Sequence, residues 1–320
     1  MRVPNLPLGA GLAAGLAATF AAFGPPRTAQ AQELEPAFEG ARLMSFEGAR
    51  LLSYAGALRA LSTSNDAIYL NPAGLALSNI YSIEGNFLDD LRGRQRFFNA
   101  SVMDSQAGPV AGGLAYTYMT RTVGVDPQGA EYTLEGHRAE LSVATKVAET
   151  VAIGVTGRYL NFTAKHGEAD DPARAIDIFT IDAGLQWRSQ SGFCLGLAAY
   201  NLTKPDYREV PISWGAGLGF EAEGFAIEAD IRYNARIGKA AFSGAVAYAF
   251  GGVVPIRLGG SYDLASQSAS ISAGIGYQTK EFSADFGFRQ RVSEGRYGPD
   301  DLDGARMIGL SLRLMIPQSQ

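Results

Sequence analysis

The sequence lacks several features on which soluble enzymes and helical membrane proteins depend. After Phe23 it has no run of about 18 apolar residues, the length needed by a membrane-spanning helix. The only cysteine, Cys194, cannot form an internal disulfide. Charged residues make up 18% of the chain and the net charge is −5, so nothing indicates nucleic-acid binding. If the mature chain crosses a membrane, it must do so as β-strands.

Motifs of catalytic and cofactor sites are also missing. The sequence has no G-x-S-x-G elbow, and its two histidines, His137 and His166, lie near expected loops without metal-ligand spacing. Residues 215–219 read GAGLG, like a nucleotide-binding loop, but they lie inside an alternating segment with no helix after them. We therefore predict a protein that is not an enzyme and needs no metal or cofactor.

The N-terminal residues predict export. Arg2 precedes an apolar run at residues 8–23, and Ala29-Gln30-Ala31 forms an A-x-A cleavage site. The alternative is a retained anchor helix, but the apolar run is short for a span of ~20 residues. We expect residues 1–31 to be a cleaved signal peptide.

What the sequence has in abundance suits membrane strands. Its 39 glycines and 14 tyrosines are typical of a barrel with aromatic girdles, and alternating strands also explain a mean hydropathy near zero. From Ile80 onward, apolar residues alternate with small or polar ones. Near the C-terminus, for example, Phe282, Ala284, Phe286 and Phe288 alternate with Ser283, Asp285, Gly287 and Arg289. Only a strand places two such sets on opposite faces.

About fourteen such segments of roughly 9–13 residues predict an all-β, transmembrane antiparallel barrel over residues 79–320. The expected starts are Ile80, Arg96, Pro109, His137, Val151, Ile176, Gly192, Pro211, Gly224, Ala240, Pro255, Gln267, Glu281 and Arg306. Connections after even-numbered strands are short, and longer loops are expected at residues 121–136, 165–175, 204–210 and 292–305. This asymmetry and the even count place both termini in the periplasm. A soluble β-sandwich is the alternative, but it would not require this sorting of loops.

The two faces of the strands differ in chemistry. The outward set is apolar, with aromatic residues near strand ends. The inward set mixes small residues with charges of both signs, which either line a water-filled path or pair with each other and with a plug. The expected polar network of the lumen contains Glu84, Glu140, Arg158, Asp182, Arg188, Glu228, Asp230, Arg232, Arg257, Asp285, Arg289 and Arg313.

Residues 32–78 do not alternate, and they are the expected plug, because a barrel of this size is too wide to fill with its own side chains. A short helix is expected at residues 54–61, and Asn65 or Asp66 is expected to cap another turn. Asn71-Pro72 should end that turn, and Gly74 can supply a positive φ.

This segment resembles the N-terminal hatch of the FadL-type and PorV-type outer-membrane barrels. The similarity lies in Gly56-Ala57-Leu58-Arg59-Ala60 and in Asp66, Asn71, Pro72, Ala73 and Gly74, the last four forming an N-P-A-G motif. Leu58 replaces a glycine of the family pattern, and Asn65-Asp66 replaces its acidic pair. The resemblance implies a fourteen-stranded barrel in a Gram-negative outer membrane, closed by residues 32–78.

Two functions follow from the resemblance. FadL-like members carry hydrophobic molecules such as long-chain fatty acids inward past a moving hatch, whereas PorV-like members serve protein secretion or surface motility. The partners expected are therefore outer-membrane lipids, the barrel-insertion machinery, and either a hydrophobic small molecule or secretion and motility proteins.

Overall fold

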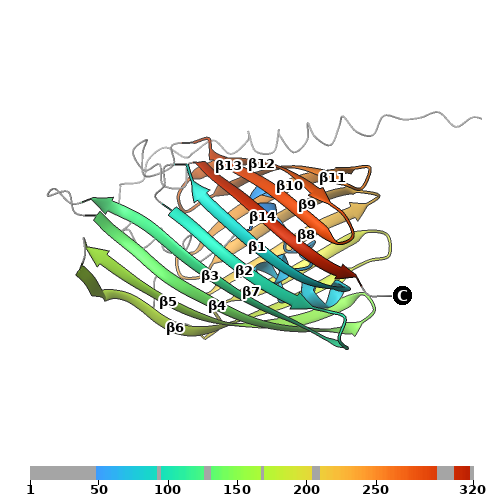
Figure 1. The fold of residues 1–320 in the computed structure, drawn as a ribbon, viewed down its shortest axis with the longest axis horizontal. Helices are drawn as coiled ribbons and strands as arrows, with labels where there is room; N and C mark the ends of the chain where they lie inside the picture. Colours follow the sequence, from blue (N-terminus) through green and yellow to red (C-terminus); the bar gives the residue numbers. More distant parts are fainter. Residues whose placement is uncertain are drawn as a thin grey trace, which may run out of the picture. The chain divides into compact units, whose positions relative to one another are not determined.

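The computed structural model describes residues 48–91, 95–125, 131–166, 169–203, 210–293 and 306–317. In this part of the chain, fourteen antiparallel strands close into a barrel in which each strand pairs with its sequence neighbours and β1 pairs with β14 (Figure 1). The strands are β1 (Ile80–Asp90), β2 (Gln95–Asp104), β3 (Val110–Val125), β4 (Glu131–Ala148), β5 (Val151–His166), β6 (Ala169–Arg188), β7 (Phe193–Tyr200), β8 (Ser213–Ala222), β9 (Phe225–Asn234), β10 (Lys239–Phe250), β11 (Val254–Asp263), β12 (Ser268–Gln278), β13 (Phe282–Arg291) and β14 (Arg306–Pro317). The predicted fold class and strand count are confirmed.

The wall alternates as its sequence does. In β14, Leu310, Leu312 and Leu314 are exposed on the outer face, whereas Ser311 and Arg313 are buried on the inner face. Apolar and aromatic side chains continue around the outer face. Because the sheet is closed, its backbone N–H and C=O groups are hydrogen-bonded between strands, which is necessary where lipid offers them no partner. No helix in the described ranges is long and apolar enough to cross a membrane.

Two predicted strand boundaries are wrong. Every strand begins within two residues of its expected start except β4 and β6, which begin earlier, at Glu131 and Ala169. The predicted loops 121–136 and 165–175 are therefore mostly strand. Their glycines, proline and charges break the alternation, but register shifts at Thr122/Gly124 and Phe162/Ala164 absorb the extra residues as bulges while pairing continues. His137 accordingly lies in β4.

Residues 48–78, hereafter the inner segment, lie inside the barrel (blue in Figure 1). They form α3 (Ala49–Ser53), α4 (Asp66–Leu70) and η1, a 3₁₀ helix (Pro72–Leu77). The predicted signal peptide and residues 32–47 lie outside the described residues. The helix expected at residues 54–61 is not formed, because the amides of residues 58–61 donate to carboxylates of β9 instead of to carbonyl oxygens of a preceding helical turn.

Small residues of the wall make room for the inner segment. A methyl group at Gly154 would lie 2.5 Å from the Pro72 carbonyl carbon, and one at Gly259 would lie 2.9 Å from that of Tyr54. Gly74 is needed for close packing within the inner segment, and not for a positive φ as expected: its φ is ordinary, but a side chain there would overlap the Ser62 carbonyl oxygen of the same segment. The segment and the wall are thus in backbone contact.

Candidate functional site

The predicted hatch motif forms the turn between α4 and η1. Asn71 is extended, with φ −153° and ψ 97°, so it ends α4, and its Oδ1 accepts a hydrogen bond from the Ala73 amide at 3.3 Å. The Asn71 Nδ2 donates to the carbonyl oxygens of Arg59 at 3.0 Å and Leu185 at 3.1 Å. Pro72, Ala73 and Gly74 are buried in the first turn of η1. One side chain therefore joins two parts of the inner segment to β6.

Asp66 takes part in a first group of charges inside the barrel. Its carboxylate lies 3.1 Å from Arg50 of α3 and 3.6 Å from Arg313 of β14. Arg313 also binds Glu84 of β1 at 2.6 Å, since these two residues are opposite each other in the β1–β14 register. Asn65, expected as a possible cap, makes no capping bond and instead bonds Ser82 and Ser101 of the wall.

A second group spans β4 to β6. Arg158 lies 2.9 Å from Glu140 and 2.5 Å from Asp182, and Arg138 lies 3.2 Å from Glu140. These four side chains are almost fully buried, so each charge has an opposite charge beside it where water is excluded. Arg138 also lies over the ring of Tyr69 from the inner segment, 5.5 Å from its centroid.

The third group, hereafter the β9 anchor, consists of Glu228 and Asp230 together with the residues 58–61 that they bind. Glu228 accepts the amides of Ala60 at 2.5 Å and Leu61 at 3.1 Å. Asp230 accepts the amides of Leu58 at 3.1 Å and Arg59 at 3.3 Å, and it pairs with the Arg59 guanidinium at 2.7 Å. The wall therefore holds this stretch by its backbone as well as by its charge.

Tyr200 and Gln186 extend the β9 anchor. The Tyr200 hydroxyl accepts from Arg59 Nε at 2.8 Å and donates to the Leu70 carbonyl at 2.6 Å. The Gln186 amide donates to the Ala60 carbonyl. Strands β6, β7 and β9 thus all bind one turn of the inner segment.

The remaining predicted residues are dispersed. Arg257 pairs with Asp285 at 2.6 Å across β12. Arg232 donates to Ser213 at 3.3 Å, lies over the Tyr200 ring and pairs with no carboxylate of the described residues. Arg289 donates to Ser272 at 3.4 Å.

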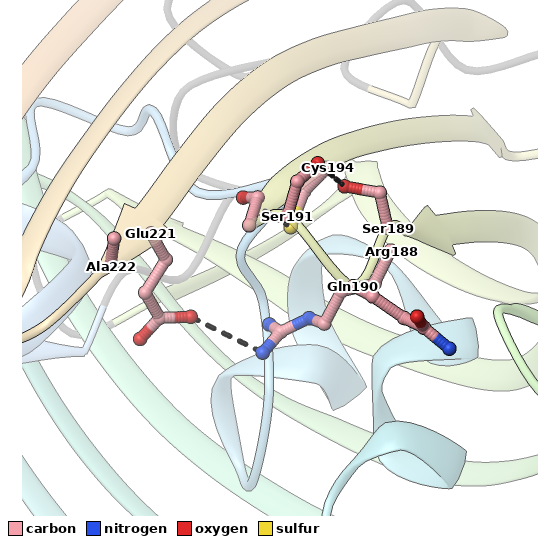
Figure 2. A pocket seen from close by; sticks show the side chains of 8 residues that line it. Arg188, Ser189, Gln190, Ser191, Cys194, Glu221 and Ala222 are labelled. Atoms are coloured by element: carbon pink, nitrogen blue, oxygen red, sulfur yellow. Dashed lines mark hydrogen bonds and ion pairs between the residues drawn. The ribbon is translucent and has the colours of Figure 1, made fainter.

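Arg188 is not in the interior network. It pairs with Glu221 at 3.2 Å near the turns that end β6 and β8, and both side chains are partly exposed. The pair lines a cavity of about 230 Å³ together with Ser189, Ser191 and Cys194. Figure 2 shows the side chains of this cavity and the contact between Arg188 and Glu221. The structure therefore does not bring Arg188 together with the other predicted lumen residues.

Burial affects the titration of the inner segment. Burial alone lowers the pKa of Arg59, but Tyr200 and Asp230 outweigh it and leave the pKa raised. Burial likewise lowers the pKa of Arg50, but Asp66 together with Tyr54 and Asp285 outweighs it and leaves the pKa raised. Burial and the nearby Glu140 raise the pKa of Tyr69. Both arginines therefore stay charged and Tyr69 stays neutral at any physiological pH.

The barrel also has an apolar surface on its inner face, where the sequence pattern predicts small and charged residues. Leu88, Met119 and Leu160 are at most 2% exposed and point inward near the end of the barrel where odd-numbered strands finish. We call this surface the apolar collar; its members are Leu88, Phe97, Met119, Leu134, Leu160, Phe162, Ile176, Ile178, Val210 and Met307. Met307 of the collar lies opposite Arg289 in the register, and Arg289 lies opposite Ser272, so the inner face becomes polar at β13 and β12. Strands β9 and β10 also present polar inward residues, Arg232 and Ser243.

Several anchoring residues were also missed. Arg59 lies in the motif that carried the family resemblance, but nothing local in the sequence pairs it with Asp230, which is 171 positions away. Arg138 was detectable, because it is two residues from Glu140 and so shares its face. Tyr200 lies at an inward position of the alternating pattern of β7, but tyrosines were expected on the outer face.

Replacing Asn71 by alanine should loosen the inner segment without unfolding the barrel. The substitution leaves the Arg59 and Leu185 carbonyl oxygens without their Asn71 donor, and a buried polar group without its partner costs about 1–3 kcal/mol. Hydrogen exchange should become faster at residues 58–61, and channel conductance in planar bilayers should rise. Unchanged exchange and conductance would contradict the role of Asn71.

Comparisons with known proteins agree with this geometry. No family model and no curated protein matches the sequence. Among solved structures, the monoaromatic hydrocarbon channel CymD has a TM-score of 0.64 and 13% identity, covering 87% of this chain and 99% of its own. The Ralstonia pickettii toluene transporter TbuX has a TM-score of 0.60 and 12% identity, with 86% and 99% covered. A Pseudomonas aeruginosa FadL homologue has a TM-score of 0.55 and 14% identity, with 84% and 97% covered.

The fold and the apolar outer face define a fourteen-stranded outer-membrane β-barrel whose lumen is occupied by its own chain. Within that class, the chain has the fold of the FadL-type barrels, as the sequence resemblance predicts.

Proposed function

We propose that the protein carries hydrophobic molecules inward across the outer membrane. The observation that supports this most is the apolar collar, which gives the barrel an apolar inner face in the same buried cluster as Ile68 and Leu75 of the inner segment. A channel for ions or sugars would expose polar groups there, because desolvating a hydrophilic solute has a high free-energy cost. The hydrocarbon and toluene channels of the same fold are consistent with this proposal.

Long-chain fatty acids are the substrates that we favour within this class. The collar lies on β1–β6 and β14, whereas the opposite side presents polar residues, so the lumen is amphipathic at this level. Arg232 is the cation on the polar side that lacks an acidic partner among the described residues, and a guanidinium suits a carboxylate head group.

We propose that residues 32–78 act as the hatch and that both termini are periplasmic. The inner segment leads into β1 at Ile80, and the two longest connections between strands, residues 201–212 and 292–305, lie at the opposite end of the barrel, as expected of external loops. Passage of a molecule through the lumen then requires the inner segment to move away from the collar.

Leu88→Asn is expected to reduce fatty-acid uptake by roughly tenfold, since it places an amide in the collar and about 1.4 kcal/mol corresponds to a factor of ten. Uptake of a labelled fatty acid into vesicles containing the purified barrel measures this. Ser272→Asn is the matched control on the polar side and should leave uptake within twofold. Equal uptake by both variants would argue against the collar as the route.

The alternative is a PorV-like scaffold for secretion or motility. A folded barrel that takes up no hydrophobic molecule but retains protein partners in mild detergent would favour it. Recovery of the barrel alone, with uptake, supports the transporter.

A further inference from the structure

The outer face of the barrel has a groove across β6, β7, β8 and β9. Its volume is about 500 Å³ and no charged residue lines it. Its lining includes four alanines, of which Ala183, Ala199 and Ala216 lie on the outer face. Ala183 lies opposite Ala199, and Ala199 lies opposite Trp214. We call this feature the outer groove.

Larger apolar side chains line the rest of the outer groove. Leu197, Trp214, Ile231 and Tyr233 are each between 38% and 50% exposed, and they point away from the lumen. The groove is continuous with the apolar outer face of the neighbouring strands, the surface that meets the membrane. Neither water nor a charged group suits an unbroken apolar lining, so the occupant must be a hydrocarbon.

The wall behind the groove has little side-chain bulk. Gly184, Ala198 and Gly215 form a row across β6, β7 and β8 and point inward. A methyl group at Gly184 would lie 2.9 Å from Pro72 Cδ, and one at Gly215 would lie 2.6 Å from Arg59 Cδ. One layer of backbone therefore separates the outer groove from the inner segment.

We propose that the outer groove is a binding site for one acyl chain of a membrane lipid. The groove lies on the outer face and therefore contacts lipid. An acyl chain bound over the alanines would prevent a second acyl chain from binding there. The bound chain supports the thin part of the wall against which the inner segment packs. This proposal does not depend on the transport function.

The two tryptophans of the chain provide the test, since Trp214 lines the groove, whereas Trp187 lies on the same outer face but is not one of the residues that line the groove. Trp187→Phe leaves Trp214 as the sole fluorophore, and Trp214→Phe leaves Trp187. Each variant is reconstituted in bilayers that mix phosphatidylcholine with increasing fractions of the same lipid brominated on its acyl chains, which quench tryptophan. A tryptophan in contact with one lipid site loses fluorescence linearly with the brominated fraction. A tryptophan in contact with several lipid sites loses most of its fluorescence already at a low brominated fraction.

We expect a linear curve for Trp214 and a steep curve for Trp187. Filling the groove with Ala199→Leu and Ala216→Leu should make the Trp214 curve steep, whereas Ala139→Leu on the outer face of β4 should leave it linear. A steep Trp214 curve without the filling substitutions, or a linear one that survives them, would overturn the proposal. So would loss of the linear quenching on adding a free fatty acid, which would assign the groove to the transported molecule. Heat-modifiable migration on gels verifies that each variant is folded.

Discussion

Gly196→Val is expected to open the lumen to ions and raise single-channel conductance severalfold. Gly196 of β7 points inward, and a Cβ there would overlap the Arg59 carbonyl oxygen and lie 2.8 Å from the Ala60 Cα. These are backbone atoms, so no side-chain rotation relieves the overlap, and overpacking of this kind displaces the backbone. The displaced stretch is the one held by the β9 anchor.

Planar-bilayer recordings measure the effect, and hydrogen exchange at residues 58–61 locates it. Gly112→Val is the matched control, because Gly112 is also a strand glycine but has no atom within 4 Å of a Cβ built on it. That variant should conduct like the parent protein. If Gly196→Val stays as closed and as protected as Gly112→Val, the inner segment does not close the lumen at this place.

Asp230→Asn is expected to give the second large effect, by detaching the inner segment from β9. The side chains of Arg59 and Asp230 are 6% and 0% exposed, and breaking a buried ion pair by removing one partner costs about 3–5 kcal/mol. Asparagine also weakens the bonds to the Leu58 and Arg59 amides. Hydrogen exchange at these two amides should therefore accelerate by at least a hundredfold.

An exposed ion pair provides the control for that variant. Arg96 and Asp89 lie 2.8 Å apart, with side chains 53% and 17% exposed, and such pairs contribute about 0–1 kcal/mol. Asp89→Asn should leave exchange in the inner segment unchanged. The double variant Arg59→Ala/Asp230→Asn should be less destabilised than Asp230→Asn alone, because no unpaired guanidinium remains. Full protection in Asp230→Asn would show that the β9 anchor does not hold the segment.

The strands were predictable because one face of the wall contacts lipid and the other faces the lumen. Apolar residues therefore alternate with small or polar ones over most of the wall. The prediction failed in β4 and β6, where bulges break the alternation but not the pairing. Alternation also predicts which face of the sheet a residue lies on, but not which residue its side chain contacts. It therefore identified Glu84 and Arg313 as inward, but their pairing depends on closure between β1 and β14.

Other features of the site depend on spatial relations that no local pattern carries. Arg257 reaches Asp285 across β12, where a side chain at Gly276 would overlap the Asp285 carboxylate. The apolar collar was missed because its members come from seven strands and the connection before β8, each contributing one or two residues. The sequence predicts a turn at N-P-A-G, but the partners of Asn71, the Arg59 and Leu185 carbonyl groups, are evident only in the structure.

A reversible tether between the inner segment and the wall tests whether this segment must move for a hydrophobic molecule to pass. A Cβ built on Gly309 of β14 lies 3.2 Å from the Ala49 Cβ of α3, close to the ~3.5–4.5 Å that a disulfide spans. Ala49→Cys and Gly309→Cys, introduced together with Cys194→Ser, can therefore be crosslinked and then reduced in the same vesicles. We predict that labelled fatty acid enters vesicles containing the reduced protein and is blocked when the disulfide forms. Equal uptake by the reduced and the crosslinked protein would show that uptake does not require the inner segment to move.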